Sequence, residues 1–442
     1  MKKRLLILAS LLVLLGLAGA LASSGRGQDR KVEAGTVASA LSAEILGQMQ
    51  VGAQLVATVR GPKPKVPRKL RFQWSVCDSA GGGCTDVAGA TRQRFGVGIA
   101  LVGRRLRVRI TIVKPNVTRT LTSRIAGPIV GPSDPVIAAA GDIACDPASS
   151  QFRSGTGTAK NCRQKWTSDL MLNAGLSAIL PVGDLQYECG FADAFAASYD
   201  PSWGRLKPIT RPAIGNHEYG RACKTNDASP YFAYFGALAG AAPGGWYSYD
   251  LGAWHLIALN SECGYGSGAA KVGGCGAGSP QETWLKKDLA GHTNGCTLAY
   301  WHEPRFSSGE HGDTQSMAVI WNDLVAAHAD VVLAGHNHDY ERFEPIGATP
   351  QDTAGAASTT TGAPNFQDPV LDPNGIREFV VGTGGKNHYG FGSQPPLAGE
   401  VVTDASTYGV LKLTLHPTGY DWQFVNDPGS GSFTDSGSAS CH

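Results

Sequence analysis

Residues 331–342 read VVLAGHNHDYER, and this stretch points to the fold class. Its first four residues, 331–334, form an apolar run that suits a buried strand. The run ends in Gly335, which His336 and His338 follow closely. Glycine suits a chain that must turn sharply while its backbone passes near a bound group. The stretch therefore predicts a buried strand whose carboxyl end carries candidate metal ligands.

The same pattern, an apolar run followed by polar side chains, occurs four more times along the chain. The runs cover residues 136–140, 178–182, 212–214 and 297–301, and the segments after them are Gly141-Asp142, Gly183-Asp184 with Tyr187, Gly215-Asn216-His217-Glu218, and His302. In open α/β sheets ligands collect at the carboxyl ends of strands, so segments far apart in sequence can converge there. One such segment is commonly only a turn, but five in succession indicate a single site.

Residues 135–442 alternate between short apolar runs and helical segments, which is typical of an α/β domain with mixed sheets. The clearest helix begins at Ser279, because Ser279 can cap it and Pro280 fits its first position. Glu282 then completes a capping box. Further expected elements are a helix near residues 316–329 and hairpins over residues 246–260 and 409–425.

The formal net charge of +2 hides two regions of opposite charge. Residues 26–132 hold 18 Lys/Arg against 5 Asp/Glu, a net charge of +13, whereas residues 133–442 hold 17 against 31, a net charge of −14. The first four residues supply the remaining +3. A hydrophobic content of 42% can fill large cores and excludes a wholly disordered chain. The composition thus predicts two folded bodies of opposite charge.

The basic region, residues 30–130, contains short runs of alternating apolar and polar residues separated by turn residues. These runs cover residues 54–59, 70–76, 105–113 and 119–125. Alternation in runs this short indicates a small all-β sandwich. Trp74, followed by Cys77 and Cys84, resembles the immunoglobulin-like modules that are appended to secreted bacterial enzymes. Residues 127–135, with three prolines and two glycines, have the composition of a linker.

The amino-terminal segment has the layout of a secretory signal peptide. Lys2, Lys3 and Arg4 precede an apolar run over residues 5–21, and small residues follow it. We therefore expect residues 1–25 to be a signal peptide and the protein to be secreted or displayed at the cell surface. An uncleaved membrane anchor is the alternative, because the run approaches the length of a membrane span.

The ten cysteines are even in number, which fits disulfides in an oxidising compartment. Close spacing favours three bridges, Cys77–Cys84, Cys145–Cys162 and Cys263–Cys275. The sequence leaves the remaining connectivity open.

The strand-end segments resemble the motifs of the calcineurin-like metallophosphoesterases. The matching segments are GDIAC at 141–145, GDLQY at 183–187, GNHE at 215–218, His302 and GHNHDYER at 335–342. Within that family the chain resembles the purple acid phosphatases, because Tyr187 stands where that branch has a tyrosinate ligand. The resemblance extends over nearly all of residues 135–442. It implies a metallophosphoesterase βαβ sandwich, with two mixed sheets flanked by helices.

The resemblance also implies a centre of two metal ions. Asp142, Tyr187 and His338 would bind the first ion, Asn216, His302 and His336 the second, and Asp184 would bridge them. Carboxylate and phenolate oxygens favour a hard trivalent ion such as Fe³⁺, whereas two imidazoles and an amide oxygen suit a divalent ion such as Zn²⁺, Mn²⁺ or Fe²⁺. The proton donor to the leaving group is expected to be His217, next to Asn216, or His311, which follows His302 by nine residues.

These features predict a secreted dinuclear-metal phosphatase that hydrolyses phosphate monoesters with a metal-activated water. A phosphodiesterase or nucleotidase would use the same ligands. An inactive cell-surface protein that binds polyanions is the alternative from another class, and the complete set of candidate ligands argues against it. We expect the basic region to contact anionic cell-wall polymer or a membrane surface, or to pack against the acidic domain. No specific nucleic-acid recognition is expected, and the sequence indicates no oligomeric state.

Overall fold

The chain divides into two compact units, Met1–Gly131 and Pro132–His442. The computed structural model describes residues 41–47, 49–51, 54–60, 69–114, 117–129, 134–220, 223, 228–263, 272–292, 294–349, 366–392 and 395–442. The predicted signal peptide, residues 1–25, lies outside the described residues. Within the described part of the chain, no helix combines the length and the apolar character needed to cross a membrane.

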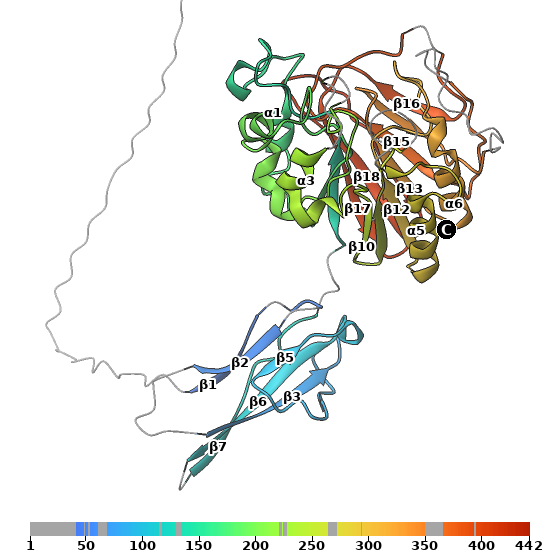
Figure 1. Ribbon diagram of the computed structural model, residues 1–442. Helices are drawn as coiled ribbons and strands as arrows, with labels where there is room; N and C mark the ends of the chain where they lie inside the picture. The colour runs from blue at the N-terminus through green and yellow to red at the C-terminus, as the bar shows by residue number, and fades with distance from the viewer. Residues whose placement is uncertain are drawn as a thin grey trace, which may run out of the picture. The chain divides into compact units, whose positions relative to one another are not determined.

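The described part of the first unit consists of two antiparallel sheets (Figure 1). One has the order β1 (Ser42–Leu46), β2 (Gln54–Arg60), β5 (Arg94–Gly96), and the other has the order β4 (Thr85–Asp86), β3 (Lys69–Cys77), β6 (Arg105–Lys114), β7 (Val117–Thr122). Leu55 of β2, Trp74 of β3 and Val108 of β6 belong to one buried cluster, so the two sheets share a core. These sheets agree with an all-β region, and its immunoglobulin-like character stays a prediction.

Two mixed sheets form the centre of the second unit. The larger has the order β10 (Tyr247–Leu251), β11 (Trp254–Ala258), β12 (Cys296–Tyr300), β13 (Val331–Ala334), β15 (Arg377–Val381), β14 (Tyr340–Phe343), β16 (Glu400–Asp404). The smaller has the order β19 (Ser436–Ser440), β18 (Gly419–Asn426), β17 (Gly409–His416), β8 (Val136–Ala140), β9 (Ala178–Pro181). Strands β11, β12, β13 and β15 are parallel neighbours, as are β8 and β9. The predicted mixed α/β class is confirmed.

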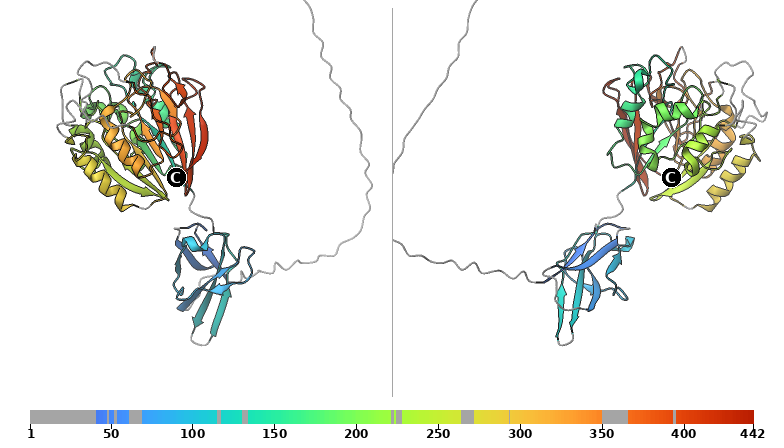
Figure 2. Two further views of the ribbon diagram at one scale, coloured as in Figure 1. Left: turned by 90° about the vertical axis from the view of Figure 1, so that its right-hand side faces the viewer. Right: turned by 60° about the vertical axis from the view of Figure 1, so that its left-hand side comes forward.

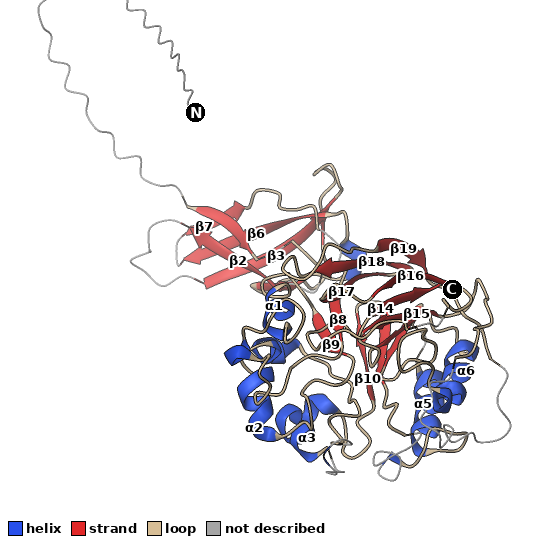
Figure 3. Cartoon of the chain, turned by 90° about the horizontal axis from the view of Figure 1, so that it is seen from above, coloured by secondary structure: helices blue, strands red, loops and turns tan. Residues whose placement is uncertain are grey.

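The helices lie outside the two sheets (Figures 1 and 3). Those on one side are α1 (Gln164–Asp169), α2 (Ala192–Ala194) and α3 (Ser229–Phe235), and those on the opposite side are α5 (Pro280–Gly291) and α6 (Ala318–Ala326). Short 3₁₀ turns cover Arg153–Gly155, Trp203–Ile209, Gly236–Ala239 and Gln315–Met317, and a π turn covers Phe195–Tyr199. The left view of Figure 2 brings the side of α5 and α6 toward the viewer, and the right view brings the side of α1 and α3 forward. One apolar cluster with residues from both sheets fills the interior.

The expected helix starts and hairpins are largely confirmed. The Ser279 side chain accepts a hydrogen bond from the Glu282 backbone N–H at 3.3 Å, and the Glu282 carboxylate accepts from Gly278 N–H at 3.0 Å. The second expected helix is the Gln315–Met317 turn continued by α6. Strands β10 and β11 form one antiparallel hairpin and β17 and β18 the other.

The strand predicted over residues 212–214 is wrong. This segment joins β9 only through isolated parallel bridges, from Thr210 to Ile179 and from Ala213 to Val182. Arg211 N–H and Ala213 N–H donate to the Ile179 and Pro181 carbonyl oxygens at 2.8 Å. Pro181 faces this segment but has no N–H to donate back, so the ladder is interrupted there. The segment nevertheless runs alongside β9, and it delivers Asn216 to the same edge as the true strands.

All ten cysteines are paired. The bridges are Cys77–Cys84, Cys145–Cys162, Cys189–Cys223, Cys263–Cys275 and Cys296–Cys441. The three bridges expected from close spacing are therefore confirmed. Cys296 begins β12 of the larger sheet and Cys441 follows β19 of the smaller, so this bridge links the two sheets covalently.

Candidate metal centre

Six segments that follow strands or strand-like runs meet at one edge of the second unit. Five were expected from the sequence, and the sixth follows β15 at Gly382. Glycines make this approach feasible. A Cβ at Gly183 would lie 2.4 Å from His302 Cγ, and a Cβ at Gly382 would lie 1.9 Å from the Asn337 carbonyl oxygen. Any larger residue would push these backbones apart, so the glycines set the distance between the ligand-bearing loops.

Asp142, Tyr187 and His338 form the first of two groups of candidate ligands. The Tyr187 hydroxyl lies 2.7 Å from Asp142 Oδ1 and 2.9 Å from His338 Nε2. His338 Nε2 is itself 3.2 Å from Asp142 Oδ1. All three side chains are buried. Their donor atoms thus face one another, as expected for ligands of a common ion.

Asn216, His302 and His336 form the second group. His302 Nε2 lies 3.0 Å from Asn216 Oδ1 and 3.3 Å from His336 Nδ1. Asp184 approaches the same nitrogen, because its Oδ2 is 3.2 Å from His302 Nε2. The ligand atoms of Asp184, His302 and His336 all lie within 4.8 Å of one another. This group is richer in imidazole than the first.

Two backbone contacts hold the groups side by side. Asp142 Oδ2 accepts a hydrogen bond from His336 N–H at 2.9 Å, and Asp184 Oδ1 accepts one from His217 N–H at 2.9 Å. The structure therefore brings all seven candidate ligands together. The direct contacts of Asp184 are with the second group, and its bridging role stays a prediction.

Partner groups orient the two most buried imidazoles of this site. His302 Nδ1 lies 2.9 Å from the Val182 carbonyl oxygen, and His338 Nδ1 lies 2.5 Å from the Asn387 carbonyl oxygen. An Nδ1–H that donates to a carbonyl fixes the tautomer, so Nε2 presents its lone pair to the site. Both rings are therefore held in the form that binds a metal.

The electrostatics of the site favour a cation beside the two carboxylates. Asp142 and Asp184 are at most 1% exposed, and burying two carboxylates is costly without positive charge beside them. Burial opposes ionisation of Asp184, yet the neighbouring His302 and His217 hold its pKa well below the usual range. Burial, with the charge of Asp142, raises the pKa of Tyr187 well above 10. A phenolate at Tyr187 therefore needs a strongly charged ion next to it.

The donor chemistry fits two different metal ions. A carboxylate and a phenol beside one imidazole suit a hard ion, and two imidazoles with an amide oxygen suit a borderline divalent ion. The donor atoms of each group converge on one another. The residues present thus fit the pair of metals that the sequence predicts.

The two candidate proton donors lie beside this set. The His217 ring is 4.2 Å from the Tyr187 ring, its Nδ1 is 2.5 Å from the Glu188 carbonyl oxygen, and its Nε2 is 3.7 Å from Asp184 Oδ2. The His311 ring is 4.6 Å from the His336 ring, and its backbone N–H donates to Asn337 Oδ1 at 2.7 Å. His311 is solvent-exposed, whereas His217 is partly buried.

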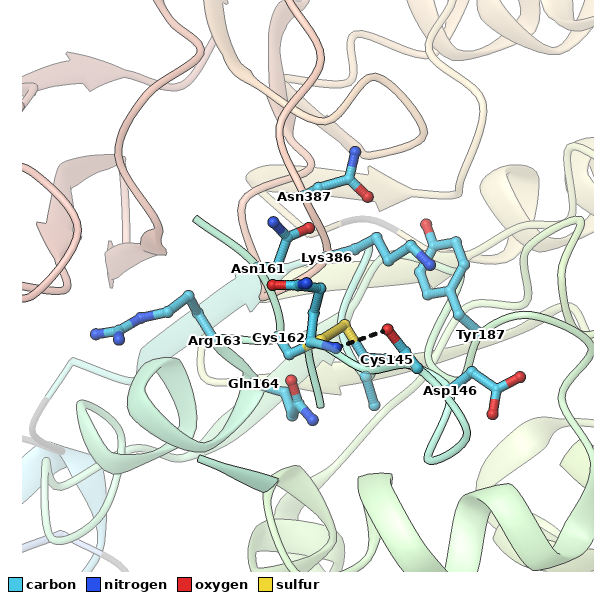
Figure 4. Close-up of a disulfide and its surroundings, with 12 residues drawn as sticks. Cys145, Asp146, Asn161, Cys162, Arg163, Gln164, Tyr187, Lys386 and Asn387 are labelled. Carbon is cyan, nitrogen blue, oxygen red and sulfur yellow. Dashed lines mark hydrogen bonds between the residues drawn. A yellow bond between two sulfur atoms is a disulfide. The ribbon is translucent and has the colours of Figure 1, made fainter. Parts of the chain in front are cut away.

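Sequence reasoning missed the residues that follow β15. The Tyr389 ring stacks on His338 at 4.0 Å, and Lys386 Nζ lies 4.4 Å from the centre of the Tyr187 ring. Figure 4 shows Lys386 directed toward Tyr187 beside the Cys145–Cys162 disulfide. The signal was present, because glycines follow β15 at positions 382, 384 and 385. The first residue types that could bind a metal, Asn387, His388 and Tyr389, come only five to seven residues after Gly382.

Glu218 is a second residue that the sequence left without a role. Its buried carboxylate accepts hydrogen bonds from the backbone N–H groups of Leu185, Gln186 and Gly215 at 2.8, 3.1 and 2.9 Å. It therefore joins the loop that carries Asp184 and Tyr187 to the loop that carries Asn216. Glu218 is a positioning residue of the site.

No protein-family model matches the chain. It is 30% identical over 244 residues to purple acid phosphatase 21 of Arabidopsis thaliana, which covers 49% of this chain and 52% of that protein. It is 32% identical over 150 residues to tartrate-resistant acid phosphatase type 5 of Rattus norvegicus, which covers 32% of this chain and 43% of that protein. The chain thus spans about half the length of these curated relatives.

A solved structure shows the fold. A purple acid phosphatase from yellow lupin seeds superposes with a TM-score of 0.51 at 16% sequence identity, covering 89% of this chain and 73% of that one. The chain is therefore similar in sequence to purple acid phosphatases and has the fold of a solved member of that family.

Proposed function

We propose that the second unit is a dinuclear-metal phosphatase that hydrolyses phosphate monoesters by attack of an activated water. One observation carries this proposal, namely the convergence of six buried and one partly buried N- and O-donor side chains at one edge of the α/β unit. The similarity to purple acid phosphatases supports the same reaction class. Such a site needs no protein nucleophile.

In this proposal each group of ligands holds one ion. Asp142, Tyr187 and His338 hold a trivalent ion, proposed to be Fe³⁺; Asn216, His302 and His336 hold a divalent ion, and Asp184 is shared. The ions, when bound, supply the Lewis-acid chemistry that activates water and neutralises the phosphate oxygens. The chain's part is to fix the ligand positions through Glu218 and the strand-end glycines.

We assign to His217 the role of proton donor to the leaving group or hydrogen-bond donor to a phosphate oxygen. Its Nδ1 faces the Glu188 carbonyl oxygen, so the Nε2 edge is turned to the ligand set, 3.7 Å from Asp184 Oδ2. When the ring is protonated, Nε2–H can donate a hydrogen bond or a proton to an oxygen of the substrate. His311 stands at the exposed margin beside His336 and is the second candidate for this role.

Replacement of Asp184 tests the proposal. We expect Asp184→Asn to lose bound metal and to reduce phosphate release from a monoester such as p-nitrophenyl phosphate to background, because the shared carboxylate is removed. Asp193→Asn, at an exposed aspartate of α2, is the matched control and should change neither. Unchanged metal content and activity in Asp184→Asn would refute the site assignment.

The same assay separates the ester classes. A monoester and a diester with the same leaving group should be compared on the wild-type chain, and the proposal requires faster hydrolysis of the monoester. Faster hydrolysis of the diester would contradict the monoesterase proposal and indicate a phosphodiesterase that uses the same metal ligands.

We further propose that the protein is exported and that the basic unit attaches it to an anionic cell envelope. In β6, Arg105, Arg107 and Arg109 alternate with buried apolar residues, which places a row of cations on the face of the sheet away from the core. Such attraction weakens as salt screens the charges. Binding of the full chain to anionic envelope material at low salt and its release at high salt would support attachment. Absence of binding would favour packing against the acidic unit.

A further inference from the structure

A second cluster of metal-ligand side chains lies where α5 ends against the β10–β11 hairpin. Asp250 and His255 are directly opposite each other in this hairpin. Asp288 lies on α5, and His292 follows its last turn, four residues later. His255 is near the amino end of β11, whereas His302 follows the carboxyl end of the parallel strand β12. The cluster is therefore at the opposite end of the sheet from the candidate metal centre.

Three residues of this cluster have potential ligand atoms close to one another. The ligand atoms of Asp250, His255 and His292 all lie within 4.8 Å of one another. His255 Nδ1 is 2.9 Å from Asp250 Oδ1. The rings of His255 and His292 stack with centres 3.7 Å apart. Two imidazoles and a carboxylate are a ligand set that zinc accepts, with water in the fourth position.

Asp288 supports both imidazoles from behind. Its Oδ2 is 2.8 Å from His255 Nε2, which leaves Nδ1 of that ring for the site. Its backbone carbonyl oxygen is 2.7 Å from His292 Nδ1, which leaves Nε2 of that ring free. Ser248 Oγ donates to Asp288 Oδ1 at 2.7 Å and fixes the carboxylate. Contacts of this kind, behind the ligand atoms, orient histidines in metal sites.

Burial and access also suit a bound cation. The His255 side chain is 1% exposed, and a carboxylate faces each of its ring nitrogens, so the local charge favours a cation at this point. The Asp250 side chain is 53% exposed and that of His292 is 33% exposed, which gives an ion a path from solvent.

We propose that Asp250, His255 and His292 bind a divalent ion of the zinc class. On binding, the ion takes the place of a proton at His255 Nδ1, which is released to solvent, and the His292 ring turns out of the stack to present Nε2. The bound ion then links the β10–β11 hairpin to the end of α5. This site is independent of the phosphatase reaction.

Zinc stoichiometry of the full chain tests this site. Wild type and His292→Phe should be dialysed against the same low free zinc and measured by elemental analysis. Phenylalanine keeps the ring stack and removes the nitrogen, so we expect one zinc ion fewer per chain with unchanged monoester hydrolysis. His416→Phe is the matched control, because His416 also lies between two aspartates, at 2.5 and 3.0 Å, but lacks a second histidine. It should retain the wild-type zinc content.

Two further measurements keep the result interpretable. Asp250→Asn, at the exposed ligand, should lose the same ion if His292→Phe disturbs folding. The Asp184→Asn variant should keep the zinc ion that His292→Phe removes. This result would distinguish the proposed site from the catalytic one. Equal zinc content in wild type, His292→Phe and Asp250→Asn would overturn the proposal, whatever the fate of the phosphatase assignment.

Discussion

Tyr187 is the residue whose chemistry most narrows the identity of the first metal. Its hydroxyl lies between Asp142 and His338, and burial disfavours its ionisation unless a highly charged ion is present. If Fe³⁺ binds it as phenolate, the purified protein should be coloured by charge transfer from ligand to metal.

We expect Tyr187→Phe to abolish this visible absorption band. Tyr389→Phe is the matched control, because Tyr389 stacks on His338 but its hydroxyl has no place in the proposed ligand set. It should keep the band. A colourless, fully active wild type that contains zinc alone would exclude iron and leave the hydrolase assignment standing.

Gly183 shows how a single backbone position controls the site. Its φ is +84°, and a Cβ there would lie 2.4 Å from His302 Cγ. Gly175, with a φ of +69° and no atom within 4 Å of a built Cβ, has a similar backbone without the collision. An alanine at a positive φ costs about 1–2 kcal/mol from strain alone.

We therefore expect Gly175→Ala to lower the free energy of unfolding by about that amount and to keep full metal content. Gly183→Ala should cost more and should also lose metal, because His302 must move. Denaturant unfolding with elemental analysis measures both effects. Equal destabilisation with equal metal content would show that the close approach at Gly183 is not needed.

At the scale of elements, β15 is tied to the loop after β12 by Glu378. Its buried carboxylate accepts hydrogen bonds from Arg305 N–H at 2.9 Å and Phe306 N–H at 3.1 Å. Burial raises the pKa of Glu378 from 4.5 to about 8, although these donors oppose the shift. Between those values the folded chain holds a proton that the unfolded chain releases. The contribution of Glu378 to stability is thus present below pH 4.5 and declines as pH rises toward 8.

The Glu378→Gln variant should not show this decline of stability with rising pH, because glutamine does not titrate. Relative to the variant, wild type should lose up to about 1.4 kcal/mol of unfolding free energy per pH unit across this window. Glu344→Gln, at an exposed carboxylate paired with Arg377, is the control and should follow wild type. Unfolding curves at a series of pH values, with metal held constant, give the slopes. Parallel profiles for wild type and Glu378→Gln would contradict the raised pKa.

Elements with a strong local signal could be predicted from the sequence. The capping residues at Ser279 predicted the start of one helix. Short apolar runs precede five of the candidate ligands, namely Asp142, Asp184, His302, His336 and His338. The cluster at His255 could not be predicted, because it depends on the cross-strand register with Asp250 and on where α5 ends against the hairpin. Tyr389 was missed for the same reason, since stacking on His338 is a tertiary contact.

At the scale of the whole molecule, the charge asymmetry coincides with the division into two units. The basic excess lies in the all-β unit and the acidic excess in the unit with the candidate metal centre. Part of that excess is not free surface charge, because Asp142 and Asp184 are buried where bound cations would neutralise them. The near-neutral formal charge therefore describes neither unit.

The central claim is that two metal ions lie between the strand-end side chains. Anomalous diffraction from crystals of the native protein, recorded at the absorption edges of iron, manganese and zinc, tests it most directly. We predict one peak among Asp142, Tyr187 and His338, and a second among Asn216, His302 and His336, with Asp184 in contact with both. A metal-loaded, active crystal with no peak at these residues would contradict the account.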